Sequence, residues 1–112
     1  MAFEKICSVS DVDEGEMDAF DTNSGLEVLI LHLTGGEMKA YQAICPHEAI
    51  DLVEGEFDGT KLTCSAHLWQ FDGNTGKGIN PDDCAIAEYP LKIDGSDVLV
   101  DIEGIEPLQS HG

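Results

Sequence analysis

The 112-residue sequence contains no arginine and only five lysines against 23 aspartates and glutamates, so its formal net charge is -18. The lysines stand singly along the chain, whereas binding to a phosphate backbone needs clustered cationic side chains. We therefore expect no nucleic-acid partner, and repulsion from anionic membrane surfaces. The charge favours fast, salt-sensitive docking onto a basic patch of another protein, although it also suits a surface that serves only solubility.

Long apolar runs are missing as well. The longest is Val28-Leu29-Ile30-Leu31, far shorter than the roughly 20 residues of a membrane-spanning helix. The N-terminus lacks the basic and apolar regions of a signal peptide, so we expect no membrane anchor and a cytoplasmic location. In a reducing compartment, cysteines next to histidines indicate a metal site before they indicate disulfides.

Turn signals such as Asn23-Ser24-Gly25, Gly35-Gly36 and Asp94-Gly95 recur at short intervals. The runs between them are rich in β-branched and aromatic residues, which predicts an all-β fold in a single domain, residues 1–112. One helical turn is predicted near Ser10 to Glu14, with Ser10 or Asp11 as its cap. The predicted strands cover 26–33, 38–44, 60–64, 68–72, 85–93 and 97–102, and the last two form a hairpin.

The stretch from about 45 to 81 differs from the rest in holding two cysteines, two histidines, the only tryptophan and many glycines. We interpret it as a cluster-binding subdomain inserted into a β framework. The tail, residues 104–112, contains few apolar residues and is expected to be a loosely attached extension.

Two Cys-His pairs carry the chemistry. Cys45-Pro46-His47 is followed, after sixteen residues, by Cys64-Ser65-Ala66-His67. A Rieske-type [2Fe-2S] cluster binds two thiolates on one iron and two imidazoles on the other, so each loop would supply one ligand to each iron. A Cys2His2 zinc site would use the same side chains, but such sites usually pair Cys with Cys and His with His. Four unrelated buried residues would not explain two ordered pairs.

With these motifs the chain resembles the Rieske ferredoxins, most closely those of toluene-type diiron monooxygenases. The likeness implies a Rieske fold, an antiparallel β-sandwich-like framework with the inserted subdomain, and one [2Fe-2S] cluster. It implies that Cys45 and Cys64 bind the buried iron, that His47 and His67 bind the outer iron, and that a third loop around Pro81 covers the cluster. The segments that carry the likeness are Cys45 to His47, Cys64 to Phe71, Gly78 to Cys84 and Glu88 to Pro90.

The resemblance also implies a function. The protein would be an electron-transfer component, not an enzyme, and a monomer when free. It would take one electron from a flavin-containing reductase to the diiron hydroxylase of an aromatic hydrocarbon monooxygenase, whose hydroxylase component would offer a basic docking patch. Asp82 and Asp83 either steer this docking or are ordinary solvated residues. Trp69 either lies beside the cluster or a partner, or is a packing residue.

Two alternatives remain. A Rieske domain of a ring-hydroxylating oxygenase would need a second domain with a mononuclear iron held by two histidines and a carboxylate, and only His32 and His111 are left over. A ferredoxin of a Rieske dioxygenase is the other alternative. Trp69 argues against it, because many dioxygenase ferredoxins have a small residue there.

Departures from the high-potential Rieske proteins predict a low potential. Those relatives carry a Ser and a Tyr that donate hydrogen bonds to cluster sulfurs at the places of Trp69 and Phe71, and two further cysteines at the places of Ile50 and Ala66. Because such donors favour the reduced state, we expect a midpoint near the lower end of the Rieske range, roughly -150 mV. The remaining cysteines, Cys7 and Cys84, are predicted to be reduced thiols that pack as small apolar residues.

Overall fold

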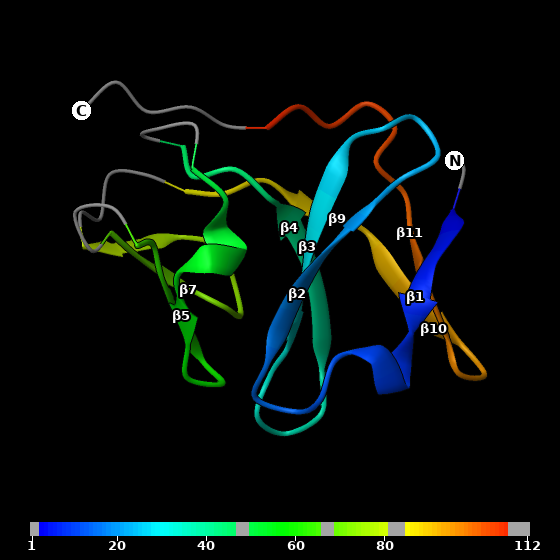
Figure 1. Ribbon diagram of the computed structural model, residues 1–112, viewed down its shortest axis with the longest axis horizontal. Coiled ribbons are helices and arrows are strands. Elements are labelled where there is room, and N and C mark those ends of the chain that lie inside the picture. The colour runs from blue at the N-terminus through cyan, green and yellow to red at the C-terminus, as the bar shows by residue number, and fades with distance from the viewer. Residues whose placement is uncertain (1–2, 47–49, 66–68, 81–84, 108–112) are drawn as a thin grey trace.

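The computed structural model describes residues 3–46, 50–65, 69–80 and 85–107, and no α-helix occurs within these ranges. The chain forms short strands and two single turns of 3-10 helix, which Figure 1 shows in order. The strands are β1 (Glu4–Ser8), β2 (Met17–Asp21), β3 (Glu27–His32), β4 (Met38–Gln42), β5 (Glu56–Phe57), β6 (Lys61–Thr63), β7 (Gln70–Asp72), β8 (Gly78–Asn80), β9 (Glu88–Tyr89), β10 (Leu91–Asp94) and β11 (Asp97–Val100), and the 3-10 turns are η1 (Val9–Asp11) and η2 (Leu52–Glu54).

The strands form three antiparallel sheets, in the orders β1-β11-β10, β2-β3-β4-β9 and β5-β6-β7-β8. Figure 1 shows strands β5 and β7 on one side of β2, β3 and β4, and strands β1, β10 and β11 on the other. The sheet that contains β3 therefore lies between the other two. This all-β architecture agrees with the fold class that the sequence predicts.

Strand β3 explains how one sheet serves two neighbours. Successive side chains of a strand point to opposite faces, so Leu29 and Leu31 pack in a first core while Val28 and Ile30 pack in a second. All four are fully buried. A strand covered on both faces needs a continuous apolar run instead of an alternating one, and this is the longest apolar run of the sequence.

The two cores belong to different parts of the fold. The first core joins β3 and β4 to the β5–β8 sheet through residues such as Leu62 and Phe71. The second joins them to the sheet of β1, β10 and β11 through Val98 and Val100. The first core also contains Cys45 and Cys64, whereas the second contains Cys7.

Most predicted strands are confirmed, and the predicted β10–β11 hairpin forms with Asp94 paired to Asp97. The predicted strand 85–93 is divided into β9 and β10 at Pro90, which has no N–H to continue a ladder. The sequence did not predict four strands: β1, β2, β5 and β8. Each of them lies at the edge of its sheet, and their sequences mix apolar and polar residues without a long apolar run.

The cap predicted for the helical turn is wrong. The turn begins at Val9, and its N-cap is Ser8 instead of Ser10 or Asp11. Asp11 lies at the third position of the turn, where its carboxylate accepts a hydrogen bond from the Ser8 N–H at 2.8 Å. An acidic residue three positions after the cap stabilises a turn in this way.

The β5–β8 sheet falls within the range of 45 to 81 that the sequence assigns to an inserted subdomain. The division into a single domain with this subdomain and a loose tail from 104 to 112 stays a prediction. None of the helices in the described part of the chain has the length and apolarity needed to cross a membrane.

Candidate metal centre

Two buried cysteines occupy the end of the first core. Cys45 is 3% exposed and Cys64 is 0% exposed, and both belong to the same cluster of packed side chains. Their neighbours in this core include Leu52, Leu62 and Phe71, which are fully buried and apolar. The core therefore presents two sulfur atoms in surroundings that exclude water.

The first cysteine ends a short ladder of backbone contacts that extends beyond β4. The Leu52 N–H donates to the Ala43 carbonyl at 2.8 Å, and Ile44 forms a bridge with Asp51. The Cys45 N–H then donates to the Ile50 carbonyl at 2.9 Å. This last bond closes a loop whose centre, 47–49, lies outside the described residues and contains His47.

The second cysteine ends a ladder of the same kind. Strands β6 and β7 pair as far as Thr63 and Gln70, and the Cys64 N–H then donates to the Trp69 carbonyl at 2.7 Å. The loop that this bond closes contains His67, which lies outside the described residues. In both loops the cysteine N–H bonds the carbonyl five residues later, so the two cysteines occupy equivalent positions at the base of matched loops.

Gly55 allows the two loops to approach each other. It follows η2, which itself follows the first loop, and a Cβ built at this position would collide with the Thr63 carbonyl oxygen of β6. A larger residue would push η2 away from the strand that leads into Cys64. The glycine is therefore required by a close backbone approach.

A third loop begins and ends beside the same sheet. Strand β8 precedes it, and on its far side Ala85 forms a bridge with Lys77 while the Ile86 N–H donates to the Gly76 carbonyl at 2.8 Å. The loop itself, 81–84, lies outside the described residues and contains Pro81, Asp82, Asp83 and Cys84. The roles predicted for these four residues stay predictions.

A model of the Rieske [2Fe-2S] domain matches residues 2–90 of the chain. The chain belongs to this family. The cofactor of the protein is accordingly one Rieske [2Fe-2S] cluster. The described donors fit it, because two buried thiols at the bases of matched loops provide the sulfur ligands that one iron of a Rieske cluster needs. The assignment of all four ligands stays a prediction, since both histidines lie outside the described residues.

Two similar proteins are named as ferredoxin components of oxygenase systems. The chain is 43% identical over 109 residues to the "Alkene monooxygenase system, ferredoxin component" of Xanthobacter autotrophicus. This match covers 96% of this chain and 84% of the relative. It is 38% identical to the "Biphenyl dioxygenase ferredoxin subunit" of a Pseudomonas species, over 90% of this chain and 93% of the relative. This Rieske protein is thus an electron carrier of oxygenase systems and not itself an enzyme.

Solved structures agree with the fold. The ferredoxin of Sphingomonas yanoikuyae B1 superposes with a TM-score of 0.80 at 28% identity, and the match covers 89% of this chain and 98% of that chain. The terminal oxygenase of carbazole 1,9a-dioxygenase from Novosphingobium sp. KA1 superposes with a TM-score of 0.77 at 19% identity. That match covers 94% of this chain but 31% of the oxygenase chain, and it shows a shared fold alone.

Two aromatic side chains follow the second Rieske loop. Phe71 is fully buried in the first core, and Trp69 is half-buried and packs against that core. Trp69 therefore has a packing role, and its backbone carbonyl also closes the Cys64 loop. The low potential that the sequence predicts stays a prediction.

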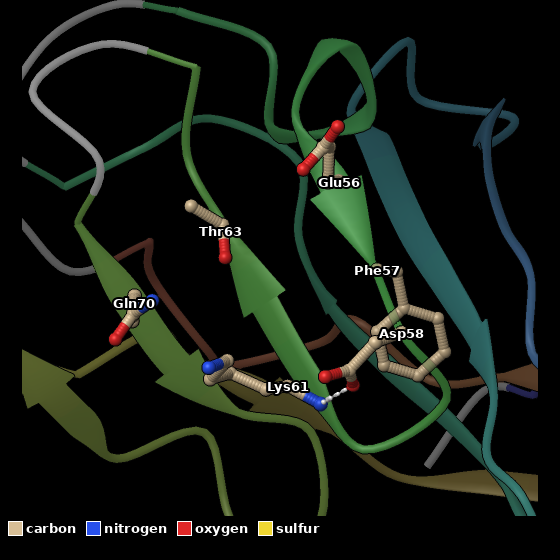
Figure 2. Close-up of a pocket in the computed structure, with 6 residues that line it drawn as sticks. All are labelled: Glu56, Phe57, Asp58, Lys61, Thr63 and Gln70. Carbon is tan, nitrogen blue, oxygen red and sulfur yellow. Dashed lines mark hydrogen bonds between the residues drawn. The ribbon is translucent and has the colours of Figure 1, made fainter.

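An open hollow of about 650 Å³ lies on strands β5 to β7, beside the second loop. Figure 2 shows the side chains that line it, which include the acidic residues Glu56 and Asp58 and the basic residue Lys61. The backbone N–H groups of Lys61 and Thr60 donate to the Asp58 carboxylate and lower its pKa. The Asp58 charge at the hollow is therefore held in place by backbone hydrogen bonds.

Cys7 and His32, which are not among the predicted cluster ligands, contribute to the framework of the fold. Cys7 is buried in the second core, as predicted for a thiol that packs as an apolar residue, and burial raises its pKa to about 11. His32 donates a hydrogen bond from Nδ1 to the Val12 carbonyl at 2.8 Å. Both side chains serve the framework.

The sequence did not predict the roles of two buried polar residues of β4, Tyr41 and Gln42. The Tyr41 hydroxyl donates to the Gly73 carbonyl at 2.8 Å, and the Gln42 amide bonds both Ile44 and Ala87. A signal was available, because an amide directly before the apolar pair Ala43-Ile44 and three residues before Cys45 is unusual in a buried strand. Its partner Ala87 is 45 residues away in sequence, so the identity of this partner required the structure.

Proposed function

We propose that this protein carries one electron from a flavin-containing reductase to the diiron hydroxylase of a hydrocarbon monooxygenase of the toluene type. Cys45, His47, Cys64 and His67 would hold the cluster. The observation that carries the proposal is the pair of matched loops, each with a buried cysteine closing its base and a histidine two or three residues further on.

The cluster supplies a site that gains and loses one electron at a time. The backbone bonds at Cys45 and Cys64 would hold the two thiolates in place, so little rearrangement would accompany a change of charge. The apolar core around Cys45 and Cys64 excludes water from the sulfur side. Electrons would then leave through the imidazoles of His47 and His67, which bind the outer iron in the proposed ligand set.

Sequence identity to named ferredoxins supports a monooxygenase hydroxylase as the electron acceptor. The alkene monooxygenase ferredoxin is 43% identical to this chain, whereas the two biphenyl dioxygenase ferredoxins are 38% and 37% identical. Trp69 also favours a monooxygenase partner, because many dioxygenase ferredoxins have a small residue at this position. An aromatic hydrocarbon as the final substrate rests on the resemblance of the sequence motifs to toluene-type systems.

Docking is supported by charge. A protein with a formal charge of -18 is attracted to a basic surface of its partners, and the attraction raises the association rate more than the affinity. Asp82 and Asp83 are the proposed contact residues, and Trp69 is a proposed neighbour of this surface. We also propose that the free protein is a cytoplasmic monomer.

Electron paramagnetic resonance of the reduced protein, together with iron and sulfide analysis, tests the ligand set. His47→Ser and His67→Ser should each abolish the anisotropic Rieske signal or electron transfer, and His111→Ser is the matched control that should retain both. Full turnover of His47→Ser in a reconstituted system would contradict the proposed ligands. A redox titration with a clearly positive midpoint would contradict the low potential.

A second destination is the oxygenase of a Rieske dioxygenase system, because several relatives are named as dioxygenase ferredoxins. Reduction rates of a purified diiron hydroxylase and a purified Rieske dioxygenase by the same reduced protein separate the two. We expect the diiron hydroxylase to be reduced faster. Faster reduction of the dioxygenase would replace the first proposal with the second.

A further inference from the structure

Gln42 is a buried polar residue at the end of β4, with 1% of its surface exposed. Burial of an amide is costly unless its oxygen and nitrogen find hydrogen-bond partners. Because an apolar residue of the same size would avoid this cost, an amide in this place indicates that its bonds hold something in position.

The Gln42 amide joins two segments of the chain. Its Oε1 accepts a hydrogen bond from the Ala87 N–H at 2.7 Å, and its Nε2 donates to the Ile44 carbonyl at 2.7 Å. The Gln42 backbone N–H also donates to the Ala87 carbonyl at 3.0 Å. Three bonds from one residue therefore fix Ile44 relative to Ala87.

Both segments lead directly to the metal centre. Ile44 precedes Cys45, the residue that closes the first loop. The segment 85–87 follows the third loop, and it is bonded to the sheet of the second loop through the Lys77–Ala85 bridge and the bond from Ile86 to Gly76. The Gln42 amide thus lies where the supports of all three loops meet.

We propose that Gln42 is a positioning residue of the Rieske centre, because its side-chain amide fixes the Cys45 loop to the segment that carries the third loop. The proposal deepens the proposed function, since it takes Cys45 as a ligand. It does not depend on which reductase or oxygenase the protein serves. Loss of the amide would let Ile44 and Ala87 shift relative to each other and admit water beside the buried Cys45.

The expected electronic effect follows from charge. Two thiolates balance the two positive charges of an oxidised [2Fe-2S] core, so the site is neutral when oxidised and carries one negative charge when reduced. Water stabilises the charged form more than the neutral form. A more open site should therefore favour the reduced state and raise the midpoint potential.

Tyr41 provides a matched control. It is adjacent to Gln42 on β4, it is fully buried, and its hydroxyl donates to the Gly73 carbonyl at 2.8 Å. Tyr41 also packs in the first core, but Tyr41→Phe keeps the ring that packs there. The change removes only the hydroxyl and its buried hydrogen bond, and it leaves the bonds to Ile44 and Ala87 intact. Any general loss of stability should therefore appear in this variant too.

The experiment measures iron release to a chelator, the reduced-state resonance spectrum and the midpoint potential in the isolated holoprotein. For Gln42→Leu we expect at least tenfold faster iron release, a broadened spectrum and at least a threefold higher ratio of reduced to oxidised protein at a fixed potential. Tyr41→Phe should change iron release less than threefold and leave the spectrum and ratio unchanged.

Gln42→Met covers the case in which Gln42→Leu does not fold, because it keeps the length and unbranched shape of the side chain, adds no charge and loses the hydrogen bonds to both Ala87 and Ile44. We expect the same changes in this variant. Wild-type iron release and spectrum in either folded variant would overturn the proposal, as would equal effects in Tyr41→Phe. Failure of the proposed function would appear separately, as an intact Rieske signal without electron transfer to any hydroxylase.

Discussion

The first and second cores pack against opposite faces of the same sheet, yet they are built differently. The second core joins strands of four to six residues, in β1, β10, β11 and β3, and its packing is almost wholly apolar. The first core joins that sheet to strands of two or three residues, β5 to β8, and includes two buried cysteines. Sheets of such short strands have little stability of their own, so we infer that bound metal supplies part of the stability of the first region.

The largest expected difference between the two regions concerns their cysteines. Cys64→Ser should abolish cluster binding, because it removes a proposed thiolate ligand from the first core. Cys7→Ser should leave iron content unchanged, since Cys7 packs in the second core. Iron and sulfide analysis of the purified variants measures both. Equal iron loss in Cys7→Ser would show that the two cores are not separate in function.

Removal of the cluster by reduction and chelation should loosen one region more than the other. We expect amide hydrogen exchange to accelerate at least tenfold in β6 and β7 and to change little in β3 and β11. The reason is that the ladder bonds of Cys45 and Cys64 lose the metal that ties their loops together. Uniform acceleration through the chain would contradict the comparison.

Large-to-small substitutions test the difference between the first and second cores further. Leu62→Ala in the first core and Ile30→Ala in the second both remove a fully buried side chain. Each should lower the free energy of unfolding by about 2–5 kcal/mol, measured by denaturant titration. Only Leu62→Ala is expected to alter the resonance spectrum of the reduced cluster, because Leu62 shares its core with Cys45 and Cys64.

The smallest expected effect is a pH dependence in the second core. Burial is the main cause that raises the pKa of Cys7 from 9.0 to about 11, with the nearby Asp11 and Asp18 charges adding to it. The folded state therefore holds the thiol proton more tightly than the unfolded state. The resulting stability is complete below pH 9 and is lost as the pH rises toward 11, by an amount on the order of 2 kcal/mol.

Cys7→Val removes this titration. The difference in unfolding free energy between the wild type and Cys7→Val should therefore change between pH 9 and pH 11, in favour of the variant. Denaturant titrations at several pH values measure the difference, which cancels the titration of lysines and tyrosines common to both proteins. A difference independent of pH would mean that the Cys7 thiol titrates normally.

Much of the fold followed from local patterns. The continuous apolar run of β3 and the Asp94-Gly95 turn are strong signals, and both elements were predicted. Edge strands such as β1 and β5 were missed, because an edge strand of mixed polarity has no periodic pattern of its own and is defined by its partner. The cap at Ser8 was missed because several acidic and hydroxyl residues compete locally for the same position.

The sequence by itself determined the chemistry of the centre, because two ordered Cys-His pairs select a Rieske cluster from their residue types and spacing alone. It also determined the strong negative charge and the all-β class. The tertiary structure decided which side chains hold the loops in place. Contacts such as Gln42 with Ala87 and Tyr41 with Gly73 join segments that are distant in sequence, and no local pattern specifies such a pairing before the chain has folded.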